Sequence, residues 1–178
     1  GITLMYMGEG LDTGDMIAKS ETDIGHKTAD ELHDELSEMG AKLLIEYLPL
    51  IASGDISPER QNDELSCYAP MISKNDGLID FSGDAEFIER QVRAMDSWPA
   101  AFTYMNGQQM KIKNAVVGDN VDEDPGTIVE ADKNGIVIAC GKGSIVVKSL
   151  QMPGKRTMTA DEYLRGNSIE KGTVLGTD

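Results

Sequence analysis

A β-hairpin is predicted at Ala101-Phe-Thr-Tyr-Met-Asn-Gly-Gln-Gln-Met-Lys-Ile-Lys113, where two runs of strand-forming residues flank Asn106-Gly107. Asn-Gly is the preferred pair for a type I′ turn, because both central residues of that turn need a positive φ. The first strand is expected over 101–105 and the second over 108–117. This hairpin indicates that the C-terminal part of the chain is a β structure.

More short strands follow the hairpin. Gly126 to Ala131 and Gly135 to Cys140 flank the turn-forming Asp132-Lys-Asn, and Ser144 to Met152 follows Gly141-Lys-Gly143. Short strands with turns about every ten residues are typical of a small sandwich or barrel. At this size an OB-like barrel is the most economical prediction.

Two helices and one further strand are predicted around these strands. The strand is expected over 78–81 and one helix over 85–95, where apolar residues recur at helical spacing. Thr159-Ala-Asp-Glu162 matches a capping box and begins a short second helix. Residues 78–178 are therefore predicted to form an OB-like β-barrel domain with flanking helices.

The first 57 residues have a pattern typical of an α/β domain. Gly1 to Met7 is largely apolar at both alternating sets of positions, which predicts a strand buried on both faces, as in a parallel sheet. A loop leads to a second strand over 16–20, and Thr28-Ala-Asp-Glu31 is another capping box. The helix that follows carries an apolar stripe of Leu32, Leu36, Met39, Leu43, Tyr47 and Ile51.

Pro49 is expected to kink or end this helix, and Gly54 to close it. A strand–loop–strand–helix run is the closing piece of an α/β domain and not a whole one. An apolar surface is therefore expected to stay exposed around the helix. Residues 58–77 lack periodicity and are interpreted as a linker.

The bulk composition is that of a globular protein, with 178 residues, 40% hydrophobic and 26% charged. The longest apolar run, near 43–51, is interrupted by Glu46 and Pro49, so no segment is predicted to span a bilayer. Cys67 and Cys140 do not make a disulfide framework, and the chain is expected to be cytoplasmic.

The net charge of −15 argues at first against nucleic-acid binding, which needs Lys and Arg. The charges are unevenly distributed, however. Residues 21–38 and 119–124 are strongly acidic, whereas 133–160 contain basic residues and no acidic one. A protein that is acidic overall can still present one basic face.

One loop is a candidate for catalysis, Leu11-Asp-Thr-Gly-Asp15. It follows the first predicted strand, and open α/β sheets place ligand sites beyond the C-terminal ends of strands. A carboxylate there can orient and charge a catalytic histidine; a plain Asp–Gly turn is the alternative. No metal, phosphate or nucleophile signature is complete, and His26 and His33 are interpreted as surface residues.

A series of longer motifs covers essentially the whole chain: Gly1 to Met16, Tyr68 to Phe81, Val92-Arg-Ala with Trp98 to Phe102, Pro125 to Ile128, Leu150 to Met158 and Asp161 to Gly166. In this order and spacing they resemble the methionyl-tRNA formyltransferases. The resemblance implies transfer of a formyl group from 10-formyltetrahydrofolate to the α-amine of methionine on initiator tRNA.

The resemblance also implies a domain organisation. Residues 1–57 would be the end of a Rossmann-like catalytic domain whose N-terminal half lies outside this chain, and the OB-like domain would help to hold the tRNA. The family's catalytic Asn and His belong to an upstream Asn-x-His segment, and no Asn-x-His occurs in this sequence. The chain by itself is therefore expected to be inactive.

Of the family's catalytic Asn, His and Asp, only the aspartate carries over, onto Asp12, with Asp15 as the competing choice. The resemblance implies that the preceding residues line the pterin pocket of the folate: Met7, Gly8, Glu9, Gly10 and Leu11. The tRNA is expected to contact six cations on one face of the barrel: Lys111, Lys113, Lys142, Lys148, Lys155 and Arg156. No metal is expected.

Two other functions remain open. A sugar-nucleotide formyltransferase of the UDP-amino-arabinose type shares the barrel and the Trp-Pro element, but Leu11 to Asp15 and Pro153 to Met158 are more similar to the tRNA enzyme. A non-catalytic OB-type RNA-binding module would leave the first 57 residues without a role.

Overall fold

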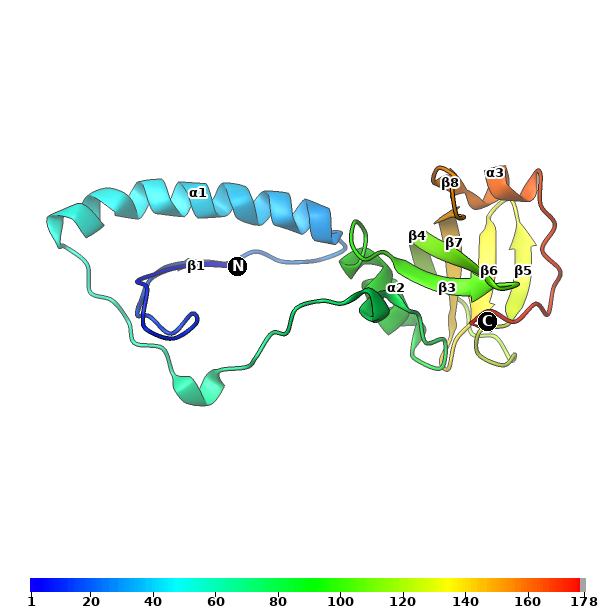
Figure 1. Cartoon of the computed structure of the whole chain (residues 1–178), viewed down its shortest axis with the longest axis horizontal. Coiled ribbons are helices and arrows are strands. Elements are labelled where there is room, and N and C mark those ends of the chain that lie inside the picture. The colour runs from blue at the N-terminus through cyan, green and yellow to red at the C-terminus, as the bar shows by residue number, and fades with distance from the viewer. Residues whose placement is uncertain (177–178) are drawn as a thin grey trace. The chain divides into compact units, whose positions relative to one another are not determined.

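The computed structural model describes residues 1–176, which form two compact units, one of Gly1–Met71 and one that begins at Ile72 (Figure 1). The division between the units falls inside the segment interpreted as a linker. No helix among the described residues is both long and apolar enough to cross a membrane.

The first unit is a two-stranded sheet packed against one long helix. Strands β1 (Ile2–Met5) and β2 (Met16–Ser20) are antiparallel, and α1 (Ala29–Ser53) contacts both. The prediction that the first strand is buried on both faces in a parallel sheet is therefore wrong for this chain. Its side chains are exposed or half-buried, because within the described residues β1 pairs only with β2.

Helix α1 begins and ends where its capping signals predict. Thr28 and Glu31 form the expected capping box, and Gly54 closes the helix with a φ of 80°. Pro49 was expected to kink or end the helix, but it lies inside it. The helix continues past Pro49 to Ser53. The amides of Gly54 and Asp55 then close its C-terminus by donating to the carbonyls of Ile51 and Leu50.

The apolar stripe of α1 faces the strands. Leu43 is buried and the other five stripe residues are half-buried. Four further large apolar residues of the same helix stay exposed: Leu44 at 44%, Ile45 at 74%, Leu48 at 55% and Leu50 at 41%. The expectation of an exposed apolar surface around this helix is confirmed.

The second unit is an antiparallel sheet with the strand order β3-β4-β7-β6-β5 and β8 paired to β7. The strands are β3 (Ala101–Met105), β4 (Gln108–Gly118), β5 (Ile128–Asp132), β6 (Gly135–Ala139), β7 (Ser144–Gln151) and β8 (Met158–Thr159). Helix α2 (Ala85–Ala94) contacts β4 and β7, and α3 (Ala160–Leu164) contacts β5 to β8 (Figure 1). Its core includes Ile88, Met110, Ile136 and Ile145, all fully buried.

Local signals predicted most of this unit. Asn106 and Gly107 both have a positive φ, 51° and 71°, as the type I′ turn requires. The strand expected over 78–81 is wrong, because only Leu78 bridges to Phe102. The chain turns at once after it, where Asp80 accepts hydrogen bonds from the amides of Ser82 and Gly83.

The strands alone do not close into a barrel. In the described part of the chain, β3 and β5 are the two edges of the sheet and do not pair with each other. The segment 172–176 lies along β5, with the amide of Ile128 donating to the carbonyl of Thr173 at 2.8 Å. Its last described residue reaches β3, where the amide of Gly176 donates to the carbonyl of Tyr104 at 2.9 Å.

Candidate functional site

The β1–β2 connection is a tight loop that carries the candidate aspartate. Its base is closed by the amide of Tyr6, which donates to the carbonyl of Asp15 at 3.0 Å. Gly14 crosses directly over this base: a Cβ atom at this position would lie 1.7 Å from the carbonyl oxygen of Tyr6. Only glycine fits there, so the sequence of this loop fixes its path.

Asp12 sits at the exposed part of this loop in the left-handed region, with a φ of 52°. Its backbone is held by a residue far away in sequence. The side-chain Nε2 of Gln61 donates to the carbonyl oxygens of Asp12 and Gly14, each at 2.7 Å. Within residues 1–176 no hydrogen bond or ion pair to the Asp12 carboxylate itself is made, which leaves it free for a substrate or another catalytic group.

An open groove of about 700 Å³ runs between this loop and the segment that contains Gln61. Asp12 and Leu11 line one side, and Cys67 and Tyr68 line the other. Lys19 also lines it and pairs with Glu59 at 3.6 Å. The groove therefore combines a carboxylate, a cation and exposed apolar surface. None of its lining residues is a histidine.

Of the residues predicted to contact the pterin, only Leu11 lines this groove with Asp12. Met7, Gly8, Glu9 and Gly10 lie on the exposed first half of the same loop. The structure thus keeps the predicted residues together on one loop. Gln61 was missed by the sequence analysis, because it lies in an irregular segment with no local pattern that marks it.

The six candidate tRNA-binding cations lie in the second unit, and two of them lie near each other. Lys111 on β4 is opposite Gln151 on β7, and the Gln151 side chain donates to the carbonyl of Lys155 at 2.9 Å. A small cavity of about 170 Å³ is lined by Lys111, Gln151 and the start of the loop that carries Lys155. Among the described residues, neither lysine forms an ion pair.

Three of the other cations pair with carboxylates. Lys113 lies 3.0 Å from Asp96, Lys142 lies 3.2 Å from Asp84, and Arg156 lies 2.8 Å from Glu162. These three carboxylates lie outside the strongly acidic segments 21–38 and 119–124.

The sixth cation, Lys148, lies on β7 and pairs with no carboxylate among the described residues. Lys148 donates to the carbonyl of Asn134 at 2.7 Å in the turn between β5 and β6. Lys142 precedes Ser144, which pairs with Gly118, whereas Lys111 pairs with Gln151 at the other end of β7. Strand register thus places Lys142 and Lys111 near opposite ends of β7.

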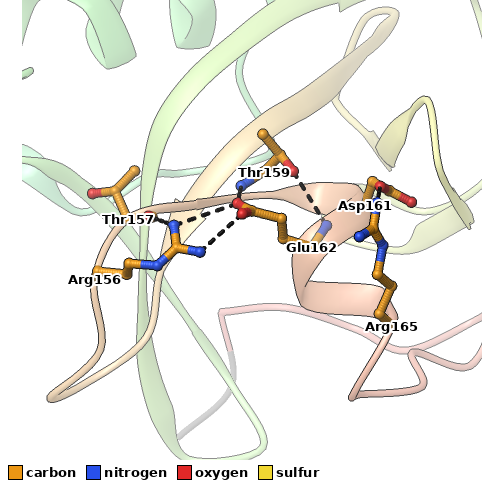
Figure 2. A network of polar contacts seen from close by, with 6 residues as sticks. All are labelled: Arg156, Thr157, Thr159, Asp161, Glu162 and Arg165. Atoms are coloured by element: carbon orange, nitrogen blue, oxygen red, sulfur yellow. Dashed lines mark hydrogen bonds and ion pairs between the residues drawn. The ribbon is translucent and has the colours of Figure 1, made fainter.

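Arg156 belongs to a polar network at the start of α3 (Figure 2). Its guanidinium contacts both carboxylate oxygens of Glu162 and also donates to the carbonyl of Thr157. Glu162 in turn accepts from the amide of Thr159 at 2.9 Å, which completes the capping box. The hydrogen bonds from Arg156 and from the Thr159 amide lower the pKa of Glu162 from 4.5 to about 2.

With this geometry described, comparison with known proteins decides the family. A family model described as formyl transferase, C-terminal domain, matches residues 71–168. The chain belongs to the formyl transferase family. The resemblance noted from the sequence motifs is therefore confirmed.

Curated relatives of this formyl transferase chain carry a more specific name. It is 43% identical over 177 residues to a methionyl-tRNA formyltransferase of Citrifermentans bemidjiense, covering 99% of this chain and 55% of that protein. It is 42% identical over 181 residues to the methionyl-tRNA formyltransferase of Bacillus subtilis, covering 100% of this chain and 57% of that protein. The chain thus spans little more than half the length of these relatives.

Solved structures support the formyl transferase fold. HypX from Aquifex aeolicus matches with a TM-score of 0.69 at 20% identity, over 94% of this chain and 31% of that one. WlaRD, described as a sugar 3N-formyl transferase, matches with a TM-score of 0.63 at 22% identity, over 86% of this chain and 55% of that one. At this low identity the likeness concerns the fold alone.

The Glu162–Arg156 pair predicts a pH-dependent stability of the second unit. Because the folded state lowers the pKa of Glu162 from 4.5 to about 2, its ionised form stabilises the fold above the usual pKa. That stabilisation is lost as the pH falls from 4.5 towards 2. At neutral pH, Glu162→Gln should therefore unfold at a lower temperature than the unsubstituted chain. This difference in melting temperature should disappear as the pH approaches about 2.

Glutamine isolates the charge in this test, since it can still accept the capping hydrogen bond. Glu123→Gln, in the exposed loop 119–124, is the matched control and should leave the melting temperature unchanged across the same range. A Glu162→Gln deficit that stays constant down to the lowest pH would contradict the assignment.

Proposed function

We propose that this chain is the C-terminal part of a methionyl-tRNA formyltransferase, which moves a formyl group from 10-formyltetrahydrofolate to the α-amine of methionine on initiator tRNA. The observation that carries the proposal is the 43% identity to such an enzyme over 99% of the chain. That alignment includes both the Asp12 loop and the second unit. The chain then supplies part of the active site and the domain that helps to hold the tRNA.

In this proposal, residues 1–57 are the end of a Rossmann-like catalytic domain, 58–77 are the linker, and an OB-like domain follows from 78. The exposed apolar residues of α1 support the first assignment, because a larger sheet would cover them. The OB-fold is a partly open barrel. The segment 172–176, lying between the edges of β5 and β3, is compatible with such an opening.

The proposed role of Asp12 follows from the chemistry of formyl transfer. The neutral amine of methionine attacks the formyl carbon, so a proton must leave the nitrogen and an oxyanion must be stabilised. A carboxylate on a fixed loop raises the pKa of a neighbouring histidine and helps to remove that proton. The Asn and His that stabilise the oxyanion belong to the part of the enzyme outside this chain.

The folate supplies the formyl group in this proposal, and residues 7–11 contact its pterin ring. Two structural neighbours support a folate as the donor. One HypX structure is described as a complex with tetrahydrofolic acid, and the WlaRD structure as one in the presence of 5-N-formyl-THF. Leu11 is 88% exposed and adjoins the Asp12 carboxylate, so an apolar contact surface is available beside the proposed reacting groups.

The proposed tRNA contacts are the six cations Lys111, Lys113, Lys142, Lys148, Lys155 and Arg156. Lys111, Lys148 and Lys155 contribute most in this proposal, because no carboxylate among the described residues pairs with any of them. Cations that already pair with a carboxylate give up part of that interaction when they bind a phosphate. The affinity for tRNA should therefore depend more on the unpaired cations than on the paired ones.

Asp12→Asn in the longer enzyme that contains this chain should lower kcat by about 10²–10⁴-fold, the range for a group that takes part in proton transfer. Steady-state formylation of methionyl-tRNA measures it. Asp15→Asn is the matched control and should leave kcat unchanged, because only the backbone carbonyl of Asp15 closes the loop. The 178-residue chain assayed alone should show no transfer. Normal turnover of Asp12→Asn, with a loss in Asp15→Asn, would transfer the role to Asp15.

Lys155→Ala in the same enzyme should weaken tRNA binding modestly for any tRNA sequence and reduce the slope of log affinity against log salt by about one unit. Lys111→Ala should behave alike. Filter binding over a range of salt concentrations provides the measurement. Lys133→Ala, which removes an exposed lysine of the same unit from the turn between β5 and β6, should leave the slope unchanged. Unchanged affinity after the charge reversal Lys155→Glu would rule out this site.

A further inference from the structure

The loop that carries Asp12 holds a backbone conformation that needs support. A residue other than glycine is less favourable in the left-handed region, and it persists where the surrounding structure enforces it. Asp12 has a φ of 52°, and neither Leu11 nor Thr13 beside it belongs to a strand or helix. Something outside the loop must therefore fix its geometry.

That support is the side chain of Gln61. Its two partners, the carbonyl oxygens of Asp12 and Gly14, can only accept, so the amide NH₂ group must face them and uses both of its hydrogens. The two acceptors belong to the residues on either side of Thr13, so a single side chain holds both ends of this turn. Gln61 is half-buried, and its bond to the carbonyl of Gly14 is partly shielded from water.

Gln61 is itself held in place by the backbone. Two residues before it, Glu59 pairs with Met16 of β2: the amide of Met16 donates to the carbonyl of Glu59 and the amide of Glu59 donates back, both at 2.8 Å. The segment that carries Gln61 is thus hydrogen-bonded to β2, the strand that follows the Asp12 loop. This pairing fixes the position of Gln61 relative to the Asp12 loop.

We infer that Gln61 is a positioning residue for the proposed formyl transfer: it acts through the backbone of the Asp12 loop to hold the Asp12 carboxylate in its reactive orientation. The inference rests on the proposed function, since it assigns Gln61 no contact with either substrate. Glutamate at this position keeps the size but offers no donor when ionised. Alanine removes the group altogether.

The test compares Gln61→Ala, Gln61→Glu and Asp12→Asn in the longer enzyme, together with the double variant Asp12→Asn/Gln61→Ala. Both Gln61 variants should lower kcat by about 10–100-fold, with the KM values for the formyl donor and the tRNA little changed, because a misplaced catalytic group affects the chemical step. The double variant should be no slower than Asp12→Asn alone, because the two residues act as one unit.

Arg60→Ala is the matched control. Arg60 is the neighbour of Gln61, is exposed, and contacts only Asp63 at 3.9 Å among the interactions of the described residues, so kcat should not change. Retained tRNA affinity shows that each variant is folded beyond the first unit. If Gln61 had only a structural role, its loss would lower the melting temperature. The double variant Asp12→Asn/Gln61→Ala would then be slower than Asp12→Asn alone.

The outcomes separate this inference from the function on which it rests. Loss of turnover in Asp12→Asn with normal turnover in Gln61→Ala overturns the role of Gln61 and leaves the proposed function intact. Losses that multiply in the double variant also overturn it. Normal turnover in Asp12→Asn overturns the catalytic assignment of Asp12 itself, and the positioning role with it.

Discussion

The close approach of Gly14 to Tyr6 is the constraint on which the candidate site depends. A side chain at position 14 would place its Cβ 1.7 Å from the Tyr6 carbonyl oxygen, so no other residue lets the chain cross there. The crossing folds the loop back on the hairpin and presents Asp12 at its exposed part with a positive φ. Gln61 then fixes that path from outside, by two hydrogen bonds to the carbonyls on either side of Thr13.

In the second unit, the arrangement of charged side chains decides which cations are available to a polyanion. A chain with a net charge of −15 cannot attract a polyanion as a whole, so any contact with nucleic acid depends on local cations. Carboxylates such as Asp96 and Glu162 instead hold Lys113 and Arg156 at the ends of helices α2 and α3. Of the six candidate cations, Lys111, Lys148 and Lys155 are left without a carboxylate partner among the described residues.

The sequence predicted what local signals determine. The Asn106-Gly107 turn, the two capping boxes at Thr28 and Thr159, and the bounds of β3 and β4 follow from residues a few positions apart. Family motifs assigned the catalytic aspartate to Asp12, which the structure places on the exposed loop between β1 and β2. Contacts between distant segments were not predictable: Gln61 is 49 residues from Asp12, and Asp84 is 58 residues from Lys142. Such pairs are decided by packing, which no short pattern encodes.

The most direct test of the account is Gly14→Ala in the longer enzyme, with formyl transfer and tRNA binding measured side by side. If the path of the loop carries the chemistry and the second unit carries the tRNA, the substitution should lower kcat by about 10²-fold or more and leave tRNA affinity unchanged. Normal turnover would show that the Gly14 crossing does not govern the reactive geometry. Equal loss of turnover and tRNA affinity would show that the two roles are not divided between the units.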